Sequence, residues 1–241
     1  MIKINGNRLV FSFMLVMSAA ILSASAADGE LTKSEADTVL ARIRVRYEPV
    51  FTRYRGVEST REITLREYDS KAGKLLATSR IRLVRRDYFY DLPEITVLSY
   101  EKDGKQMNPT DYKPRREEPL FPVFDRSGGS HYRTEINGTI TIDGVKCYRV
   151  QVTPLDATAR HFRGNLYYRA DNLDQVLAEG SGAKLALGVK SFWMKMNMRT
   201  VQGVPAISGG TMTILVDVAL LYPNRKFVSE IKASNIRIIP L

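Results

Sequence analysis

Residues 190–199 read KSFWMKMNMR, and apart from Trp193 apolar side chains alternate with polar ones along this segment. The apolar set falls at every second position: Phe192, Met194, Met196 and Met198. A period of two is typical of a β-strand that buries one face. The segment therefore predicts an amphipathic strand, and its methionine content raises the question of what the apolar face contacts.

Three interpretations of this face are open: a packed core, a soft-metal site, or an adaptable surface for a lipophilic ligand. Thioether sulfurs favour Cu(I), which makes Met194, Met196 and Met198 the candidate metal ligands. Phe192 shares their face, however, and no His or Cys lies near them in the sequence. Methionine re-packs around variable shapes, whereas cores that specify one packing use mainly Val, Ile and Leu. The residue types thus favour a ligand-binding face.

The period of two recurs along most of the chain. Ile63 and Leu65 alternate with polar residues, as do Ile81 and Leu83, and Asp-Gly pairs at 103–104 and 143–144 are strong hairpin signals. We expect about eleven short strands in an antiparallel meander. The later strands are expected at residues 162–168, 176–179, 191–201, 212–221, 227–232 and 236–239.

One or two helices are predicted before the first strand. Thr32 and Glu35 have the spacing of a capping box. The apolar residues that follow at helical spacing are Val39, Leu40, Ile43 and Tyr47. Pro49 should interrupt the helix because it removes a backbone hydrogen bond, and the apolar stripe then continues to Gly56. Such a stripe needs a sheet to cover.

Residues 108–131 form a long irregular segment with four prolines. Its apolar side chains Leu120, Phe121 and Phe124 are unfavourable in water, so we expect them to dock on the rest of the protein. They are the candidate flap over a cavity, with Gly128 and Gly129 as a hinge. The alternative is an ordered loop that closes one end of a barrel.

Residues 1–26 have the pattern of a secretory signal peptide. Lys3 and Arg8 precede an apolar run, and Ala24-Ser25-Ala26 gives a small-x-small cleavage site. We expect cleavage after Ala26, a periplasmic location, and a single domain over residues 27–241. Cys147 is the only cysteine, so no internal disulfide forms, and its place on an expected strand predicts a buried, inert thiol.

Composition and motifs argue against two function classes. The net charge of +10 is spread over segments that also carry acidic residues, which predicts a solvated basic surface and no nucleic-acid partner. The alternative is attraction to anionic lipid surfaces or acidic polymers. The chain has no G-x-S-x-G, P-loop, H-E-x-x-H or C-x-x-C motif, and only two histidines, His131 and His161. We therefore expect no enzymatic activity and no cofactor.

The order of the elements resembles a known family. The matching segments are DSKAGK, LVRRDYFYDL, VLSYEKDGKQMNP, DGVKCYRVQVTP and GNLYYRADNLDQVLAEG. Together with the exported N-terminal helix they resemble the periplasmic outer-membrane lipoprotein carriers of LolA type, which include LolB-like and RseB-like domains. The resemblance spans residues 31–239.

The resemblance implies a mainly β (α+β) fold, in which an incomplete antiparallel β-barrel wraps around the N-terminal helix. Its concave apolar face would bind lipid or lipoprotein acyl chains, with envelope membrane proteins as partners and a carrier or chaperone role in lipoprotein sorting. The candidate lining residues are Phe192, Met194, Met196, Met198, Ile63, Leu65, Ile81 and Leu83. The alternatives are an envelope sensor or interaction domain whose concave side is filled, and a Cu(I)-binding protein.

One residue of the family can be placed. Val84-Arg85-Arg86-Asp87 is the nearest match to the family's Val-Lys-Arg-Pro segment, so the resemblance implies for Arg86 the role of locking a lid. Asp87 stands where the family has proline. The alternative is that Arg86 is a surface arginine at the end of a strand.

Overall fold

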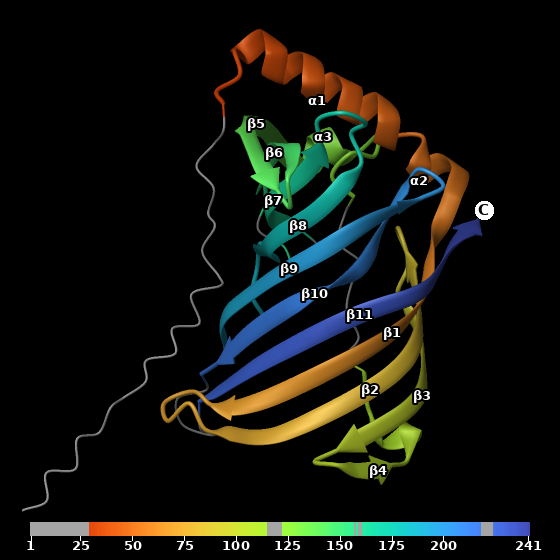
Figure 1. The fold of residues 1–241 in the computed structure, drawn as a ribbon, viewed down its shortest axis with the longest axis vertical. Coiled ribbons are helices and arrows are strands. Elements are labelled where there is room, and N and C mark those ends of the chain that lie inside the picture. Colours follow the sequence, from red (N-terminus) through yellow and green to blue (C-terminus); the bar gives the residue numbers. More distant parts are fainter. Residues whose placement is uncertain (1–28, 115–121, 157, 159–160, 218–223) are drawn as a thin grey trace, which may run out of the picture.

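The computed structural model describes residues 29–114, 122–156, 158, 161–217 and 224–241. In this part of the chain, eleven strands form one antiparallel sheet in the order β4-β3-β2-β1-β11-β10-β9-β8-β7-β6-β5. The sheet curves strongly but does not close, because β4 and β5 are its two edges (Figure 1). The mainly β fold with an incomplete antiparallel barrel is thus confirmed. The expected signal peptide lies outside the described residues.

The sheet consists of two meanders joined along one pair of strands. The first meander contains β1 (Tyr54–Asp69), β2 (Leu75–Tyr88), β3 (Glu94–Lys102) and β4 (Lys105–Met107). The second contains β5 (Tyr132–Ile142), β6 (Val145–Pro154), β7 (Phe162–Arg169), β8 (Gln175–Gly182), β9 (Val189–Val201), β10 (Val204–Val216) and β11 (Arg225–Pro240). Strand β1 pairs with β11, so the first and last strands of the chain join the two meanders.

Two strands begin or end differently from the prediction. β10 begins at Val204, not at residue 212, because a register shift between Ile207 and Gly209 keeps this glycine-containing stretch in the sheet. The two strands expected at 227–232 and 236–239 are one strand, β11. Asn235 adopts a φ of 49° where the register shifts, so the chain bulges there and does not turn. Residues 218–221 of the expected strand lie outside the described residues.

The helical region forms as its capping signals predict. α1 (Lys33–Tyr47) begins with the capping box, in which Thr32 accepts from the Glu35 amide and donates its own amide to the Glu35 carboxylate (2.8 Å). Pro49 separates it from α2 (Val50–Arg53). The helical stripe ends earlier than expected, because β1 starts at Tyr54 and already contains Gly56.

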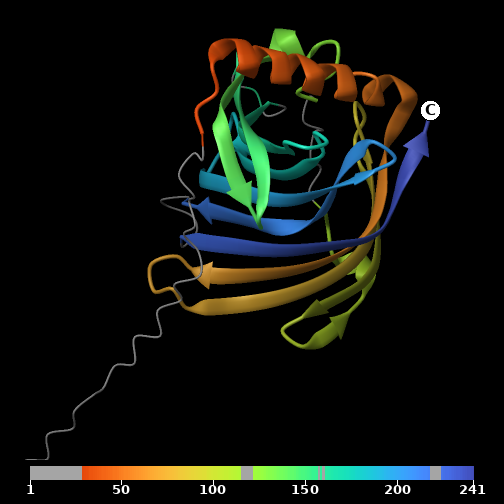
Figure 2. The ribbon, with the colours of Figure 1, turned by 45° about the horizontal axis from the view of Figure 1, so that its top comes forward.

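Helix α1 lies across one end of the curved sheet, next to β5 and above β7 and β8 (Figures 1 and 2). Its buried residues are Val39, Ile43 and Tyr47. They join a core whose sheet residues include Tyr132, Val150, Val152, Phe162, Leu166, Tyr168, Val204 and Ala206. The helix therefore covers the end of the half-barrel near the second meander.

Tyr47 fixes the helix to the turn between β7 and β8. Its ring is 2 % exposed and lies 5.5 Å from the ring of Tyr168. The hydroxyl donates to the Leu173 carbonyl (2.9 Å) and accepts from the Gln175 amide (3.0 Å). Burial raises the pKa of this hydroxyl, which stays protonated and able to donate.

We expect Tyr47→Phe to destabilise the protein by about 2–3 kcal/mol, because it leaves a buried carbonyl and a buried amide without their partner. Urea unfolding followed by circular dichroism measures the loss. Tyr148→Phe is the matched control, since Tyr148 packs against the same core but its hydroxyl bonds to no described residue; its effect should stay within about 0.5 kcal/mol. Equal losses in the two variants would contradict the anchoring role of Tyr47.

Candidate functional site on the concave face

One row of paired residues crosses the whole described sheet, and every member is apolar, aromatic or glycine. In sheet order the row is Met107, Tyr100, Ile81, Ile63, Ile231, Gly210, Met196, Ala178, Leu166, Val150 and Ile136. Directly paired residues point to the same face of a sheet. Leu166 and Val150 belong to the core that contains α1. The row therefore marks the concave face.

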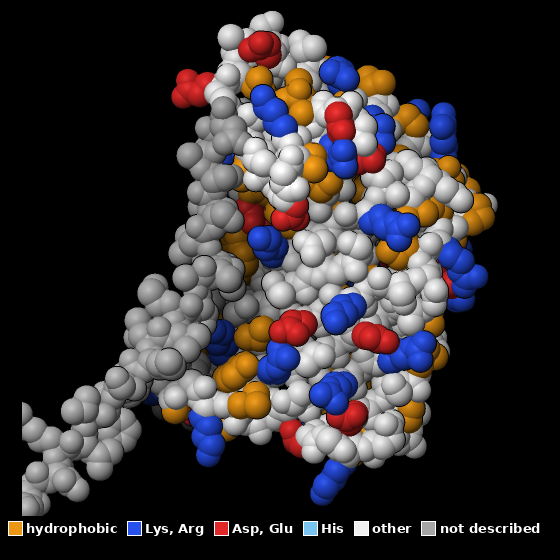
Figure 3. All heavy atoms as spheres, viewed as in Figure 1, with side chains coloured by type: hydrophobic (Ala, Val, Ile, Leu, Met, Phe, Trp, Pro, Cys, Tyr) orange, Lys and Arg blue, Asp and Glu red, His pale blue; other side chains and the backbone are white. Residues whose placement is uncertain are grey.

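The neighbouring row is polar throughout and marks the convex face. It consists of Gln106, Glu101, Arg80, Thr64, Glu230, Thr211, Lys195, Glu179, Asn165, Gln151 and Glu135. Arg80 pairs with Glu101 at 3.2 Å, and Arg66 pairs with Glu230 at 2.5 Å. Figure 3 shows Lys and Arg side chains interspersed with Asp and Glu on this face. These two rows thus separate a polar, ion-paired outer side from an apolar inner one, and on the outer side of β6, β7 and β8 the cluster of Cys147, Tyr167 and Leu177 is an apolar exception.

The structure brings the eight predicted lining residues onto the concave face. Ile63, Ile81 and Met196 lie in the apolar row itself. The adjacent row connects Leu65 through Ser229 and Met212 to Met194. Within β9 and β2, Phe192, Met198 and Leu83 follow at the same alternation. The period-two prediction therefore identified one common face.

Burial divides this face into two parts. Met194 packs against the core that contains α1, so the face continues into that core. Ile81, Leu83 and Met196 are 2–4 % exposed but belong to no core cluster of described residues. Phe192 and Met198 are half-buried. The apolar face therefore extends well beyond the area that α1 covers.

Met196 lies against Gly210, its partner on β10. A Cβ atom added at Gly210 would lie 2.9 Å from the Met196 sulfur and 2.3 Å from the Lys195 carbonyl oxygen. The φ of Gly210 is +148°, which disfavours a side chain as well. The missing side chain at 210 thus provides the space that the Met196 thioether occupies in the middle of the sheet.

A buried cation on the same face was missed at the sequence level. Arg61 is 6 % exposed and lies between Leu83 and Ala233. Its Nε donates to the Ser59 hydroxyl (3.1 Å) and its guanidinium pairs with Asp87, which also accepts from Arg85 Nε (2.6 Å). Arg61 lies at the same alternation as Ile63 and Leu65. Extending this alternation to residue 61, whatever its side chain, would have predicted that Arg61 lies on the concave face.

Arg86 lies on the convex face, whereas its neighbour Arg85 lies on the concave face. It donates to Glu58 (2.7 Å) and to Glu94 (3.0 Å). The hydrogen bond from Arg86 to Glu58, and a further one from Arg237, hold the pKa of Glu58 below its ordinary value of 4.5. Asp87, which replaces the family's proline, pairs instead with arginines of the concave face. The placement fits the surface-arginine alternative, and the lid-locking role stays a prediction.

Of the candidate flap, Leu120 and Phe121 lie outside the described residues. Phe124 is 5 % exposed, and its ring meets that of Tyr168 edge-on at 5.9 Å. It is therefore part of the core beneath α1. Of the predicted hinge, Gly128 is tightly packed, because a Cβ there would lie 2.1 Å from the Val123 carbonyl oxygen, whereas a Cβ on Gly129 would meet nothing within 4 Å.

The two histidines meet although thirty residues separate them. His161 Nε2 lies 3.4 Å from His131 Nδ1, and His161 Nδ1 is hydrogen-bonded to the Thr158 hydroxyl (2.9 Å). Neither sequence spacing nor periodicity signals this contact. Cys147 is fully buried, as predicted, and burial raises the pKa of its thiol.

The metal alternative rests on Met194, Met196 and Met198 alone. No group of three or more His, Cys, Asp or Glu that could hold a metal exists among the described residues. The three methionines share the concave face, but Met194 is engaged by the helical core and Met196 lies over Gly210.

The described elements thus form an open, curved sheet with an apolar inner face, and within them no helix is long and apolar enough to span a membrane. No family model and no curated protein sequence matches the chain. Among solved structures it is similar to a DUF1329 family protein from Desulfovibrio piger, at 15% identity over 83% of this chain and 92% of that chain, with a TM-score of 0.42.

Two further solved structures are similar at the same level. One is a LolA superfamily protein from Nitrosomonas europaea (13% identity, 83% of this chain and 94% of that chain, TM-score 0.42). The other is an outer membrane lipoprotein-sorting protein domain from Vibrio parahaemolyticus (12% identity, 85% and 92% coverage, TM-score 0.43).

Replacing Met194, Met196 and Met198 together by leucine should leave the affinity of the protein for Cu(I) unchanged, because we expect their sulfurs to fill apolar space. Competition against a Cu(I) chelator measures this affinity. The triple variant should fold, since each Met-to-Leu exchange conserves volume and costs less than about 1.5 kcal/mol. A folded triple variant with lost Cu(I) affinity would establish the metal site instead.

Arg86→Gln should raise the pKa of Glu58 towards its ordinary value, because it removes the strongest hydrogen bond to that carboxylate. A carboxyl with a lowered folded pKa stabilises the fold above its unfolded pKa, and the effect disappears as the pH falls through the folded value. The stability difference between wild type and variant should therefore be largest above pH 4.5 and vanish in acid. An NMR titration of Glu58 measures the shift, and Arg80→Gln, which removes a partner of Glu101, should leave it unchanged.

Proposed function

We propose that the protein is an exported, non-catalytic binding protein that takes a lipophilic ligand, such as an acyl chain, on the concave face of its sheet. The observation that carries this proposal is the apolar row that crosses all eleven described strands, while α1 covers only one end of the concave side. Burial of apolar area contributes about 25 cal/mol per Å². A chain-like ligand laid along such a row would gain affinity without any specific polar contact.

The residue types on this face suit a ligand of variable shape. Met196 lies where Gly210 leaves space, and Met212 continues the methionine surface next to Met194. Unbranched thioether side chains re-pack at little cost, which favours binding of flexible acyl chains over one rigid shape. A role as a periplasmic carrier in lipoprotein sorting, with envelope proteins as partners, follows from the family resemblance of the sequence.

A second function is favoured by the burial of part of this face. Ile81 and Leu83 are each 2 % exposed, and Met196 is 4 % exposed. A concave side that is already filled would make the protein an envelope sensor or interaction domain of the same fold. The two functions differ in whether a lipid analogue can enter.

The proposal predicts that a fluorescent fatty-acid analogue binds saturably and that Met196→Arg abolishes this binding. The charge would be introduced in the middle of the apolar row, where desolvation is unfavourable. Asn197→Arg is the matched control, because it places the same charge on the next residue but on the exposed convex side. It should leave binding unchanged.

If Met196→Arg unfolds the protein, Leu65→Gln provides the test. Leu65 is half-buried between Ser79 and Ser229, so we expect a folded variant whose affinity falls about tenfold. Unchanged affinity in the folded Leu65→Gln variant, or no saturable binding to the wild type, would favour the filled interaction domain. Native mass spectrometry of protein purified from its own envelope would show whether lipid co-purifies.

A further inference from the structure

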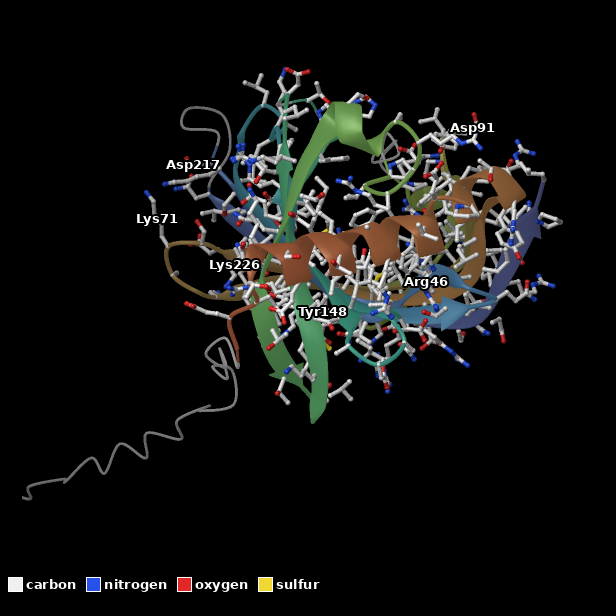
Figure 4. The ribbon with its side chains drawn as sticks, turned by 90° about the horizontal axis from the view of Figure 1, so that it is seen from above. Arg46, Lys71, Asp91, Tyr148, Asp217 and Lys226 are labelled. Atoms are coloured by element: carbon white, nitrogen blue, oxygen red, sulfur yellow. The ribbon has the colours of Figure 1, made fainter. Side chains whose placement is uncertain are left out.

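Loops of both meanders project from one end of the sheet. The antiparallel pairing places Asp69, Arg225, Val216 and Val189 side by side at the ends of β1, β11, β10 and β9. The β1–β2 hairpin and the β8–β9 loop therefore project from the same end. Figure 4 shows Lys71, Lys226 and Asp217 together at this end of the molecule, away from Asp91.

Four leucines are exposed at this end: Leu75 and Leu76 are the first residues of β2, and Leu185 and Leu187 lie in the β8–β9 loop. Leu187 is the extreme case, with a relative exposure of 106 %. Single exposed leucines are ordinary on a protein surface. Four exposed leucines at the same end of the sheet are more than single cases, and their exposure costs free energy unless they contact another apolar phase.

The same end carries an excess of positive charge. Four exposed lysines make no ion pair with any described residue: Lys71, Lys74, Lys184 and Lys226. Three acidic residues at these strand ends are already paired, Glu67 and Asp69 with Arg225 (2.8 and 3.9 Å) and Asp217 with Lys190 (3.8 Å), and Asp103 in the β3–β4 turn accepts from the Thr78 amide (2.8 Å). Lysine therefore dominates the charge that this end presents to a partner.

We propose that this end of the sheet docks on the surface of an anionic lipid bilayer. We call it the leucine–lysine rim and define it by those four leucines and four lysines. Leucine side chains in the boundary between headgroups and acyl chains lose their contact with water, while neighbouring lysines remain at the phosphates. An anionic bilayer surface therefore offers favourable contacts to both the leucines and the lysines.

The charge pattern argues against a second copy of the chain on the rim. Two rims face to face would bring the unpaired lysines of one copy against those of the other, and like charges at close range are unfavourable. An acidic protein would satisfy the lysines but not an entirely exposed leucine such as Leu187. The rim lies at the strand ends, so docking there leaves the concave face uncovered and does not depend on what that face binds.

Binding to vesicles tests the proposal. The exported protein is mixed with vesicles of phosphatidylcholine alone or with phosphatidylglycerol, and bound protein is separated by flotation. We expect binding to the anionic vesicles that weakens with salt and is lost without phosphatidylglycerol. All variants carry the same N-terminus, so differences between them arise from the substitutions.

Leu185→Ser with Leu187→Ser should weaken binding about tenfold or more, because two inserted leucines are removed. Lys71→Gln with Lys74→Gln should weaken it about fivefold for each lysine. The matched controls are Leu92→Ser, an exposed leucine in the β2–β3 turn at the other end of the sheet, and Lys195→Gln with Lys232→Gln on the convex face. They should bind as the wild type does.

Absence of binding to anionic vesicles would overturn the proposal, as would rim variants that bind no more weakly than their controls. Sedimentation velocity tests whether a second copy of the chain covers the rim instead. A wild-type dimer that dissociates in the leucine double variant would show that the rim joins two copies. Circular dichroism of each variant confirms that the fold is kept, since all substituted side chains are exposed.

Discussion

The pairing of β1 with β11 is the constraint on which the rest of the sheet depends. It runs from Tyr54 opposite Pro240 to Asp69 opposite Arg225 and joins two meanders that would otherwise each expose an edge. Arg66 and Glu230 reinforce it on the convex side at 2.5 Å. Because the first and last strands of the chain must meet, this contact has a high loop-closure cost, which the long pairing offsets.

The register of that pair also decides which faces are apolar. Ile63 stands opposite Ile231, and this match connects the apolar half-rows of the two meanders. A slip by one residue would set Thr64 against Ile231 and turn the apolar side of the first meander outwards. It would also expose to the concave face the charges that now pair with one another on the convex side. Both faces therefore favour the same register.

Alternation in the sequence predicted the common face well, since it is a local property that each strand expresses. The capping box at Thr32 and the break at Pro49 were predictable for the same reason. The start of β10 was not, because Pro205 and Gly209 are typical of turns until a neighbouring strand supplies the bulged register that accommodates them. Which strands form the two edges of the sheet was not predictable either. Residues 108–131 lie between β4 and β5 in the chain, and no local pattern reveals that these two strands are the edges of the sheet.

Polar residues of the concave face were missed for a different reason. A search for apolar residues at period two discards Arg61, although its alternation is that of Ile63. The buried guanidinium is tolerated because Ser59 and Asp87 accept from it. Arg86, one residue beyond Arg85, was placed by likeness of a short segment, and a shift of one residue in a strand moves a side chain to the other face.

The methionines that raised the first question now divide into two groups. Met194 is paired with Gly180 on β8, and Met196 with Gly210 on β10. At Gly210 the missing side chain leaves a gap that Met196 fills, whereas the side chain nearest to Gly180 is Phe162, and Met194 packs against the core that contains α1. Phe192 and Met198 are paired with Ile214 and Ile207 on β10, both large, and are themselves half-buried. Gap filling against glycine therefore explains Met196, whereas Phe192 and Met198 at the two ends of the segment present apolar surface that the pairing with β10 does not account for.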